Sequence, residues 1–271
     1  MKRKIIIALA PVGGWGEGKN NPVSSDSIVL QVRQCAAEGA ALLHLHSRDK
    51  SGKLSADTSY FDSIIDRISA EVPILIEAST GGLSLMTAQE RCRPAENKKA
   101  SFGSLNMGSL NFTDDVYQNS LPSIRMWIEK MRKAGVHPSL EIFDTGHLET
   151  ALYLIREGIL KPPYNFSFIF NCRWGMGYSY QLLNFLAARL PKQSSWGCIF
   201  AGNTDFSMHL EAAICGAHFL RVGFEDSVFI DGREAESNAD LVTGLRQKLE
   251  ILGFEIAALS EAKALLKAGA I

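Results

Sequence analysis

The sequence lacks the features that would point to a membrane, to disulfide-bonded secreted proteins or to nucleic acid. It has no basic run, and 28 Lys and Arg residues nearly balance 29 Asp and Glu residues, so we expect no nucleic-acid partner. Its apolar stretches are all shorter than the roughly 20 residues that cross a bilayer, and the one after Lys4 is too short for a signal sequence. The five cysteines form no Cys-x-x-Cys pair, which indicates buried thiols in a reducing cytoplasm.

What the sequence does have is a regular alternation of two patterns. Eight times, a short β-rich run is followed by an amphipathic stretch. The expected strands are Lys4–Leu9, Ala41–His46, Pro73–Ala78, Ala100–Leu105, Ser139–Phe143, Tyr164–Phe170, Trp196–Phe200 and His218–Val222. The expected helices are Ser25–Glu38, Asp57–Ala70, Thr87–Cys92, Leu121–Ala134, Gly146–Glu157, Ser179–Leu190, Asp205–Cys215 and Ser237–Leu252. A short extra helix is expected at Ser260–Ala268.

Strict alternation implies a parallel sheet, and eight units imply a closed (β/α)8 barrel. The length of 271 residues agrees, because such barrels have about 250 residues. A doubly wound open sheet has the same periodicity and stays an alternative. The composition shows no linker, so we expect one catalytic domain over residues 1–271. Since barrels commonly assemble, we also expect a homo-oligomer.

Two histidines end the second expected strand. Residues two apart in a strand point to the same face, so His44 and His46 should project together while Leu45 points away. In a (β/α)8 barrel the active site lies at the C-terminal ends of the strands. Two imidazoles there would supply two of the three protein ligands of a catalytic zinc ion. Elsewhere in a protein, such a pair is typically a surface or hydrogen-bonded feature.

The third ligand is expected after the eighth strand. If the chain stays extended, Arg221, Gly223 and Glu225 share one face, and a carboxylate with two histidines is a known catalytic zinc set. Alternatively, Glu225 is a solvated loop acid. Arg221 could equally form an ion pair with Glu141 inside the barrel, because an unpaired buried carboxylate is costly.

Glycine-rich polar segments follow the third and fourth strands. Ser79-Thr80-Gly81-Gly82 and Gly103-Ser104-Leu105-Asn106-Met107-Gly108 combine hydroxyl and amide groups with glycines that permit close backbone approach. We expect Ser79, Gly82, Ser104 and Asn106 to contact a substrate, although ordinary turns have the same composition.

With these segments in order, the chain resembles the β-keto acid cleavage enzyme family over nearly its whole length. The resemblance rests on His44-Leu45-His46-Ser47-Arg48-Asp49, on the two glycine-rich segments, on Arg221-Val222-Gly223-Phe224-Glu225-Asp226 and on Glu236–Val242. No single segment is specific, but five in register make a specific combination.

The resemblance implies zinc, or another divalent transition metal, bound by His44, His46 and Glu225. It implies a dyad of Arg221 and Asp226, with Asp226 as the base and Glu141 holding the dyad in place. Ser79 and Ser104 would bind the keto acid. The implied reaction converts a 3-oxo acid and acetyl-CoA to acetoacetate and an acyl-CoA by condensation and retro-Claisen cleavage.

Other functions remain open on the same residues. Metal-bound water could hydrolyse an amide or a lactone, a metal-dependent acyl-CoA lyase has related chemistry, and a barrel could bind a keto acid without turnover. Two loops also depart from the family pattern, at the ends of the sixth strand (171–177) and of the seventh (200–205). Asp205 stands there in place of a basic motif. Together with Glu17 in the first loop, it could favour a substrate with a cationic tail, or it could merely cap a helix.

Overall fold

Eight parallel strands close into a barrel, as the alternation predicts. The computed structural model describes residues 2–13, 20–82, 86–112 and 114–266. The barrel strands are β1 (Lys4–Leu9), β2 (Ala40–Leu45), β3 (Leu75–Ala78), β4 (Phe102–Asn106), β7 (His137–Ile142), β8 (Tyr164–Phe170), β9 (Ser194–Phe200) and β10 (Phe219–Val222). Each pairs in parallel with the next, and β10 returns to pair with β1, so the alternative of an open sheet is excluded.

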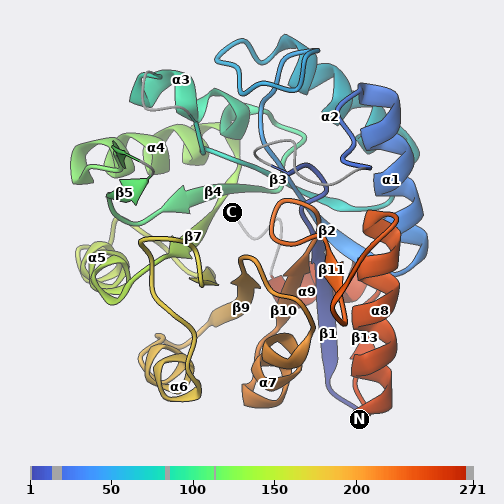
Figure 1. Ribbon diagram of the computed structural model, residues 1–271. Coiled ribbons are helices and arrows are strands. Elements are labelled where there is room, and N and C mark those ends of the chain that lie inside the picture. The colour runs from blue at the N-terminus through green and yellow to red at the C-terminus, as the bar shows by residue number, and fades with distance from the viewer. Residues whose placement is uncertain (1, 14–19, 83–85, 113, 267–271) are drawn as a thin grey trace.

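Helices surround the barrel on its outside (Figure 1). They are α1 (Ser25–Ala37), α2 (Ser59–Glu71), α3 (Ala88–Cys92) with the 3-10 turn η1 (Arg93–Glu96), α4 (Leu121–Ala134), α5 (Thr145–Arg156), α6 (Tyr180–Ala188), α7 (Ser207–Cys215), α8 (Asn238–Ile251) and α9 (Leu259–Leu266). None of these described helices has the length and apolar character needed to span a membrane.

Short polar residues fix where several helices begin. The hydroxyl groups of Ser24, Ser120 and Ser179 each accept a hydrogen bond from a backbone N–H in the first turn of α1, α4 and α6. Such caps satisfy donors that have no partner within the helix. At Ser237 the cap is reciprocal, since the Asp240 side chain also accepts from the Ser237 backbone. Local sequence therefore sets the point at which several loops at the barrel mouth end.

The two ends of the barrel differ in chemistry. At the N-terminal end, inward-facing apolar side chains such as Ile6, Leu42 and Phe219 pack with Leu266 of α9. That end is closed by apolar packing. Toward the C-terminal ends of the strands the inward positions become polar, as with Glu77 in β3 and Arg221 in β10. Since the apolar end is filled, the polar end is where a ligand can enter.

Several elements were not predicted. An antiparallel hairpin, β5 (Leu110–Phe112) and β6 (Asp115–Tyr117), lies between β4 and α4. A second hairpin, β11 (Phe229–Ile230) and β12 (Arg233–Glu234), follows β10, and β13 (Glu255–Ile256) pairs with β1. Strands of two or three residues are too short for a recognisable alternation of apolar and polar residues, so only tertiary pairing reveals them.

Candidate metal centre

The histidine pair lies at the mouth of the barrel, on its inner side. Leu43 and Leu45 of β2 point outward into the apolar core, so the alternation turns His44 inward. β2 ends at Leu45, and His46 lies just beyond it. The His44 and His46 ring centroids are 5.1 Å apart. Both histidines therefore project to one side, as their spacing predicts.

Glu225 reaches the histidines by a turn and not by an extended strand. β10 ends at Val222, and Gly223 has φ 143°. A Cβ atom at Gly223 would lie 2.1 Å from the carbonyl oxygen of Ala10, so only glycine fits there. The backbone N–H of Asp226 then donates to the Gly223 carbonyl. The expectation of an extended chain is thus wrong, and the turn brings two consecutive acids, Glu225 and Asp226, to the same guanidinium group.

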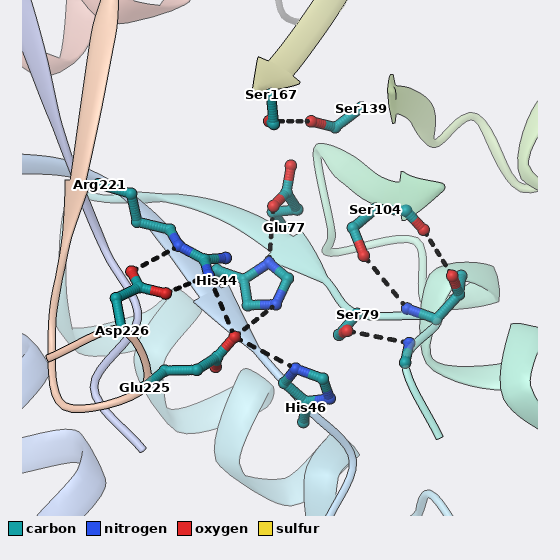
Figure 2. Close-up of polar contacts among 12 residues, drawn as sticks. His44, His46, Glu77, Ser79, Ser104, Ser139, Ser167, Arg221, Glu225 and Asp226 are labelled. Atoms are coloured by element: carbon teal, nitrogen blue, oxygen red, sulfur yellow. Dashed lines mark hydrogen bonds and ion pairs between the residues drawn. The ribbon is translucent and has the colours of Figure 1, made fainter. Parts of the chain in front are cut away.

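The distances from Glu225 to the two histidines fit a tetrahedral metal ion. Oε1 of Glu225 lies 3.5 Å from Nε2 of His44 and 3.4 Å from Nε2 of His46 (Figure 2). Ligands bound at 2.0–2.2 Å around a tetrahedral zinc ion are separated by about 3.3 Å. The side chain of His46 is 19% exposed and that of His44 is 3% exposed, so a ligand can approach from the His46 side. Three protein ligands leave the fourth position for substrate or water.

Arg221 and Asp226 form a two-pronged ion pair beside these ligands. Nε of Arg221 donates to Oδ2 of Asp226 at 2.8 Å, and Nη2 donates to Oδ1 at 2.5 Å. Nη2 also lies 3.3 Å from Oε1 of Glu225, which links the dyad to the candidate metal ligands. Burial raises the pKa of Asp226 and outweighs the lowering effect of Arg221, and Glu225 raises it further. A carboxylate with a raised pKa is a stronger base.

Glu141 lies close to this cluster without pairing with Arg221. Arg221 forms its ion pairs with Asp226 and Glu225, so the alternative of a barrel-closing pair with Glu141 does not hold. The Glu141 carboxylate lies within 4.8 Å of ligand atoms of His44 and Glu77. Burial is the main cause that raises the pKa of Glu141, to about 7.

This raised pKa predicts a pH-dependent stability. Because the folded protein holds a proton on Glu141 that the unfolded chain gives up near pH 4.5, stability falls as pH rises between about 4.5 and 7. Glu141→Gln keeps the shape and removes that loss. We expect the melting temperature of the metal-free variant to exceed that of the metal-free wild type, by more at pH 8 than at pH 5. A difference that is equal at both pH values would contradict the pKa assignment.

The expected substrate-binding residues gather at the ends of β3 and β4. Oγ of Ser79 accepts from the Gly81 backbone at 3.0 Å, and Oγ of Ser104 accepts from the Thr80 backbone at 3.4 Å. Each hydroxyl group keeps its own hydrogen to donate. Asn106 is fully buried, and neither atom of its amide has a partner among the described residues. Buried amide groups are usually hydrogen-bonded, so the side-chain amide of Asn106 is free to bind a ligand.

The two glycines that follow β3 have separate roles. A Cβ atom at Gly81 would lie 2.6 Å from Cε1 of His46, so Gly81 makes room for the candidate metal ligand. A Cβ atom at Gly82 would lie 2.9 Å from both Arg91 and Met86, so Gly82 permits packing beneath the loop. Gly82 was predicted as a site residue, whereas Gly81 was not. A substrate contact at Gly82 stays a prediction.

Two side chains near the site were also missed. Glu77 bonds to His44, and the β3 alternation of Leu75, Glu77 and Ser79 could have placed it inside the barrel. Tyr117 of the β5–β6 hairpin lies under the guanidinium group of Arg91, whose carbon is 4.4 Å from the ring centroid. No pattern in the sequence marks Tyr117, because its hairpin was not predicted.

The structure describes only one of the two acids that were expected to favour a substrate with a cationic tail. Asp205 accepts hydrogen bonds from the backbone N–H and the hydroxyl group of Ser207 at 2.8 and 2.6 Å, where α7 begins. These contacts place the Asp205 carboxylate in the turn before α7, whose N-cap residue is Phe206, and a role of Asp205 toward a cationic substrate stays a prediction. Glu17 lies outside the described residues, so its part in a cationic pocket remains a prediction.

Comparisons with known proteins find relatives that match the chain over nearly its whole length. A 3-keto-5-aminohexanoate cleavage enzyme of Fusobacterium nucleatum subsp. nucleatum is 32% identical, over 98% of this chain and 98% of its own. A 3,5-dioxohexanoate:acetyl-CoA acetone transferase of Paraburkholderia graminis is 31% identical, over 98% of this chain and 96% of its own. The apo structure of ObcA shares the fold, with a TM-score of 0.78 at 17% identity. The match covers 92% of this chain and 66% of the ObcA chain.

The sequence profile of one family matches almost the whole chain. The beta-keto acid cleavage enzyme profile aligns with residues 4–267, which include the histidine pair, the two glycine-rich segments and the Glu225–Asp226 turn. The family resemblance drawn from the sequence is thereby confirmed. The chain belongs to the β-keto acid cleavage enzyme family.

Proposed function

We propose that this protein converts a 3-oxo acid and acetyl-CoA to acetoacetate and the acyl-CoA of the remaining chain. The observation that carries the proposal is that a base adjoins a metal-binding set: Nη2 of Arg221 contacts both Glu225 and Asp226. A binding protein would need no base at this position. The names of the relatives support acetyl-CoA as the co-substrate.

His44, His46 and Glu225 would hold the metal, for which we propose zinc. Bound there, zinc would act as a Lewis acid that polarises the 3-oxo group and so acidifies the neighbouring carbon. Their spacing fits a tetrahedral ion, as shown above, and two imidazoles with one carboxylate are donors that zinc accepts. Manganese, cobalt or nickel could occupy the same donors, so metal analysis of the purified protein is needed to identify the ion.

The side chains around this set suit the first half of the reaction. Asp226 accepts a proton from C2 of the 3-oxo acid, and Arg221 keeps the carboxylate oriented through two hydrogen bonds. Nη1 of Arg221 is buried without a partner among the described residues and is available to the substrate carboxylate. Ser79 and Ser104 can donate their hydroxyl hydrogens to the same substrate.

The second half requires the C2 carbanion to attack the thioester carbonyl of acetyl-CoA, which forms a new C–C bond and frees the CoA thiolate. The thiolate then adds to the original 3-oxo carbon. The bond between that carbon and C2 breaks, the acyl group leaves on CoA, and C2 regains its proton from Asp226 as acetoacetate. Atoms and charge balance, and no oxidant or reductant is consumed.

A screen of 3-oxo acids with acetyl-CoA tests the proposal directly. We expect acetoacetate and a new acyl-CoA to appear in equal amounts, and only when both substrates are present. Consumption of an amide, a lactone or the keto acid in the absence of acetyl-CoA would instead support hydrolysis. The screen should pair an amino-substituted 3-oxo acid with its uncharged isostere, since the relatives' names include an amino acid substrate and a dioxo substrate.

We also propose that the enzyme is a cytoplasmic homo-oligomer that acts as one catalytic domain. All five cysteines are free, which suits a reducing compartment. Large apolar side chains on the surface, such as Phe185 (46% exposed), Ile214 (64%) and Ile251 (84%), suit burial between copies. Sedimentation at several protein concentrations would show whether copies associate.

A further inference from the structure

Glu77 is a buried acid that has no part in the proposed reaction. It lies on β3 directly opposite His44 in the pairing of β2 with β3, and both residues face the barrel interior. Its carboxylate oxygen Oε1 is 2.7 Å from Nδ1 of His44, and the residue is 6% exposed. A buried carboxylate needs a partner, and His44 is the partner it has.

The distance identifies this contact as a hydrogen bond and not as a pair of ligands on one ion. Two ligands of a tetrahedral zinc ion lie about 3.3 Å apart, whereas a charge-assisted N–H···O bond is roughly 2.7–2.9 Å long. A carboxylate can only accept, so Nδ1 of His44 must carry the hydrogen. The other nitrogen, Nε2, then presents its lone pair toward Glu225 and the candidate metal position (Figure 2).

We propose that Glu77 is a positioning residue that fixes the tautomer and the ring orientation of His44 for metal binding. The proposal rests on the metal site of the proposed function. A carboxylate behind a metal-bound histidine also makes the imidazole more basic and thereby a better ligand.

The far side of Glu77 is supported by two serines. In Figure 2 the carboxylate lies between His44 and the pair Ser139 and Ser167, whose hydroxyl oxygens are 3.4 Å apart. Both serines are buried. Polar groups therefore lie on both sides of the carboxylate and hold it in place against His44.

His46 has no such support. Its Nδ1 is buried without a hydrogen-bond partner among the described residues, and the ring is positioned by packing against Gly81. The two histidines therefore differ: a hydrogen bond at Nδ1 orients the His44 ring, whereas Nδ1 of His46 has no such bond among the described residues. This difference makes the effect of Glu77 specific to one ligand and open to measurement.

The test is the affinity of the full-length protein for Zn²⁺, measured by competition with a chromogenic chelator. Glu77→Leu should weaken binding about 10–100-fold, the range for loss of such a partner. Glu77→Gln should weaken it less, because the amide oxygen can still accept from Nδ1. Glu211→Gln is the matched control, since the Glu211 carboxylate on α7 accepts from the Tyr178 hydroxyl group and not from a histidine of the site, and it should leave the affinity for zinc unchanged. Glu141→Gln separates the two possible ligand sets, because Glu141 belongs only to the deeper one.

Nitrogen NMR of His44 in the metal-free protein is the second measurement. The wild type and Glu77→Gln should show the hydrogen on Nδ1 of His44. This result tests the orientation of His44 even if Glu77→Leu does not fold. A hydrogen on Nε2 with none on Nδ1 in the wild type, or unchanged zinc affinity in folded Glu77→Leu, would overturn the proposal. So would an equal loss of affinity in Glu141→Gln, which would place the ion in the deeper set of His44, Glu77 and Glu141.

These outcomes are separate from a failure of the proposed function. A wild-type protein that binds zinc through an oriented His44, but forms no acetoacetate from any 3-oxo acid, would refute the reaction and leave the role of Glu77 intact.

Discussion

His46→Ala is expected to remove both the bound metal and the turnover. The purified wild type should carry about one divalent ion per chain, because the site provides three protein ligands. Without the His46 imidazole only His44 and Glu225 remain as ligands, and two ligands are too few to retain the ion during dialysis. The removed ring is partly exposed, so the fold should survive. Elemental analysis of the dialysed variant, together with the acetoacetate assay, measures both effects.

A histidine outside the site provides the control. His218 precedes β10 at the closed end of the barrel, where its Nδ1 accepts from the Trp196 backbone. His218→Asn should keep full metal content and near wild-type turnover. The metal site would be wrong if the double variant His44→Ala, His46→Ala still carried one ion per chain after dialysis.

Asp226→Asn should retain the metal and the fold but lose at least ~10²-fold in turnover, the usual contribution of a positioned base. The amide can still accept a hydrogen bond from Arg221, so the local geometry is largely kept, but it cannot take a proton. Proton NMR in deuterated water follows exchange of the substrate's C2 hydrogen. This exchange reports the base without requiring acetyl-CoA to react.

Two companion variants sharpen this prediction. Asp205→Asn alters an acid that accepts from Ser207 at the start of α7 and should leave exchange unchanged. Arg221→Lys should be severe, because an ammonium group cannot reproduce the two parallel bonds to Asp226. Exchange of the C2 hydrogen at the wild-type rate in Asp226→Asn would show that another group is the base, and Glu141 would be the next candidate.

Patterns with a fixed period were predicted correctly from the sequence. The eight-fold alternation gave the barrel strands, with boundaries that differ by one or two residues in several cases. His44 and His46 were placed together because a strand repeats every two residues regardless of its surroundings. The inward position of Ser104 and Asn106 on β4 follows from the same rule.

Contacts that depend on a turn or on a distant strand could not be predicted in this way. The alternation of side chains along a strand placed Glu225 beside Arg221 under the assumption of an extended chain. The chain instead turns at Gly223, which packs against Ala10. The sequence also left open a pair between Arg221 and Glu141, whereas the turn brings Asp226 to Arg221 at 2.5 Å. The packing of Gly81 against His46 could not be predicted, because glycine has no side chain to mark which neighbour it accommodates.

The sequence by itself determined the eight strand–helix units, the histidine pair and the family, because each depends on local periodicity or on short segments kept in order. Closure of the barrel was decided by the pairing of β10 with β1. Only the tertiary structure decided which buried groups face one another. The bond from His44 to Glu77 joins residues 33 positions apart on neighbouring strands, and its existence depends on the register of β2 and β3. Register is set by packing over the whole sheet, so no local pattern carries it.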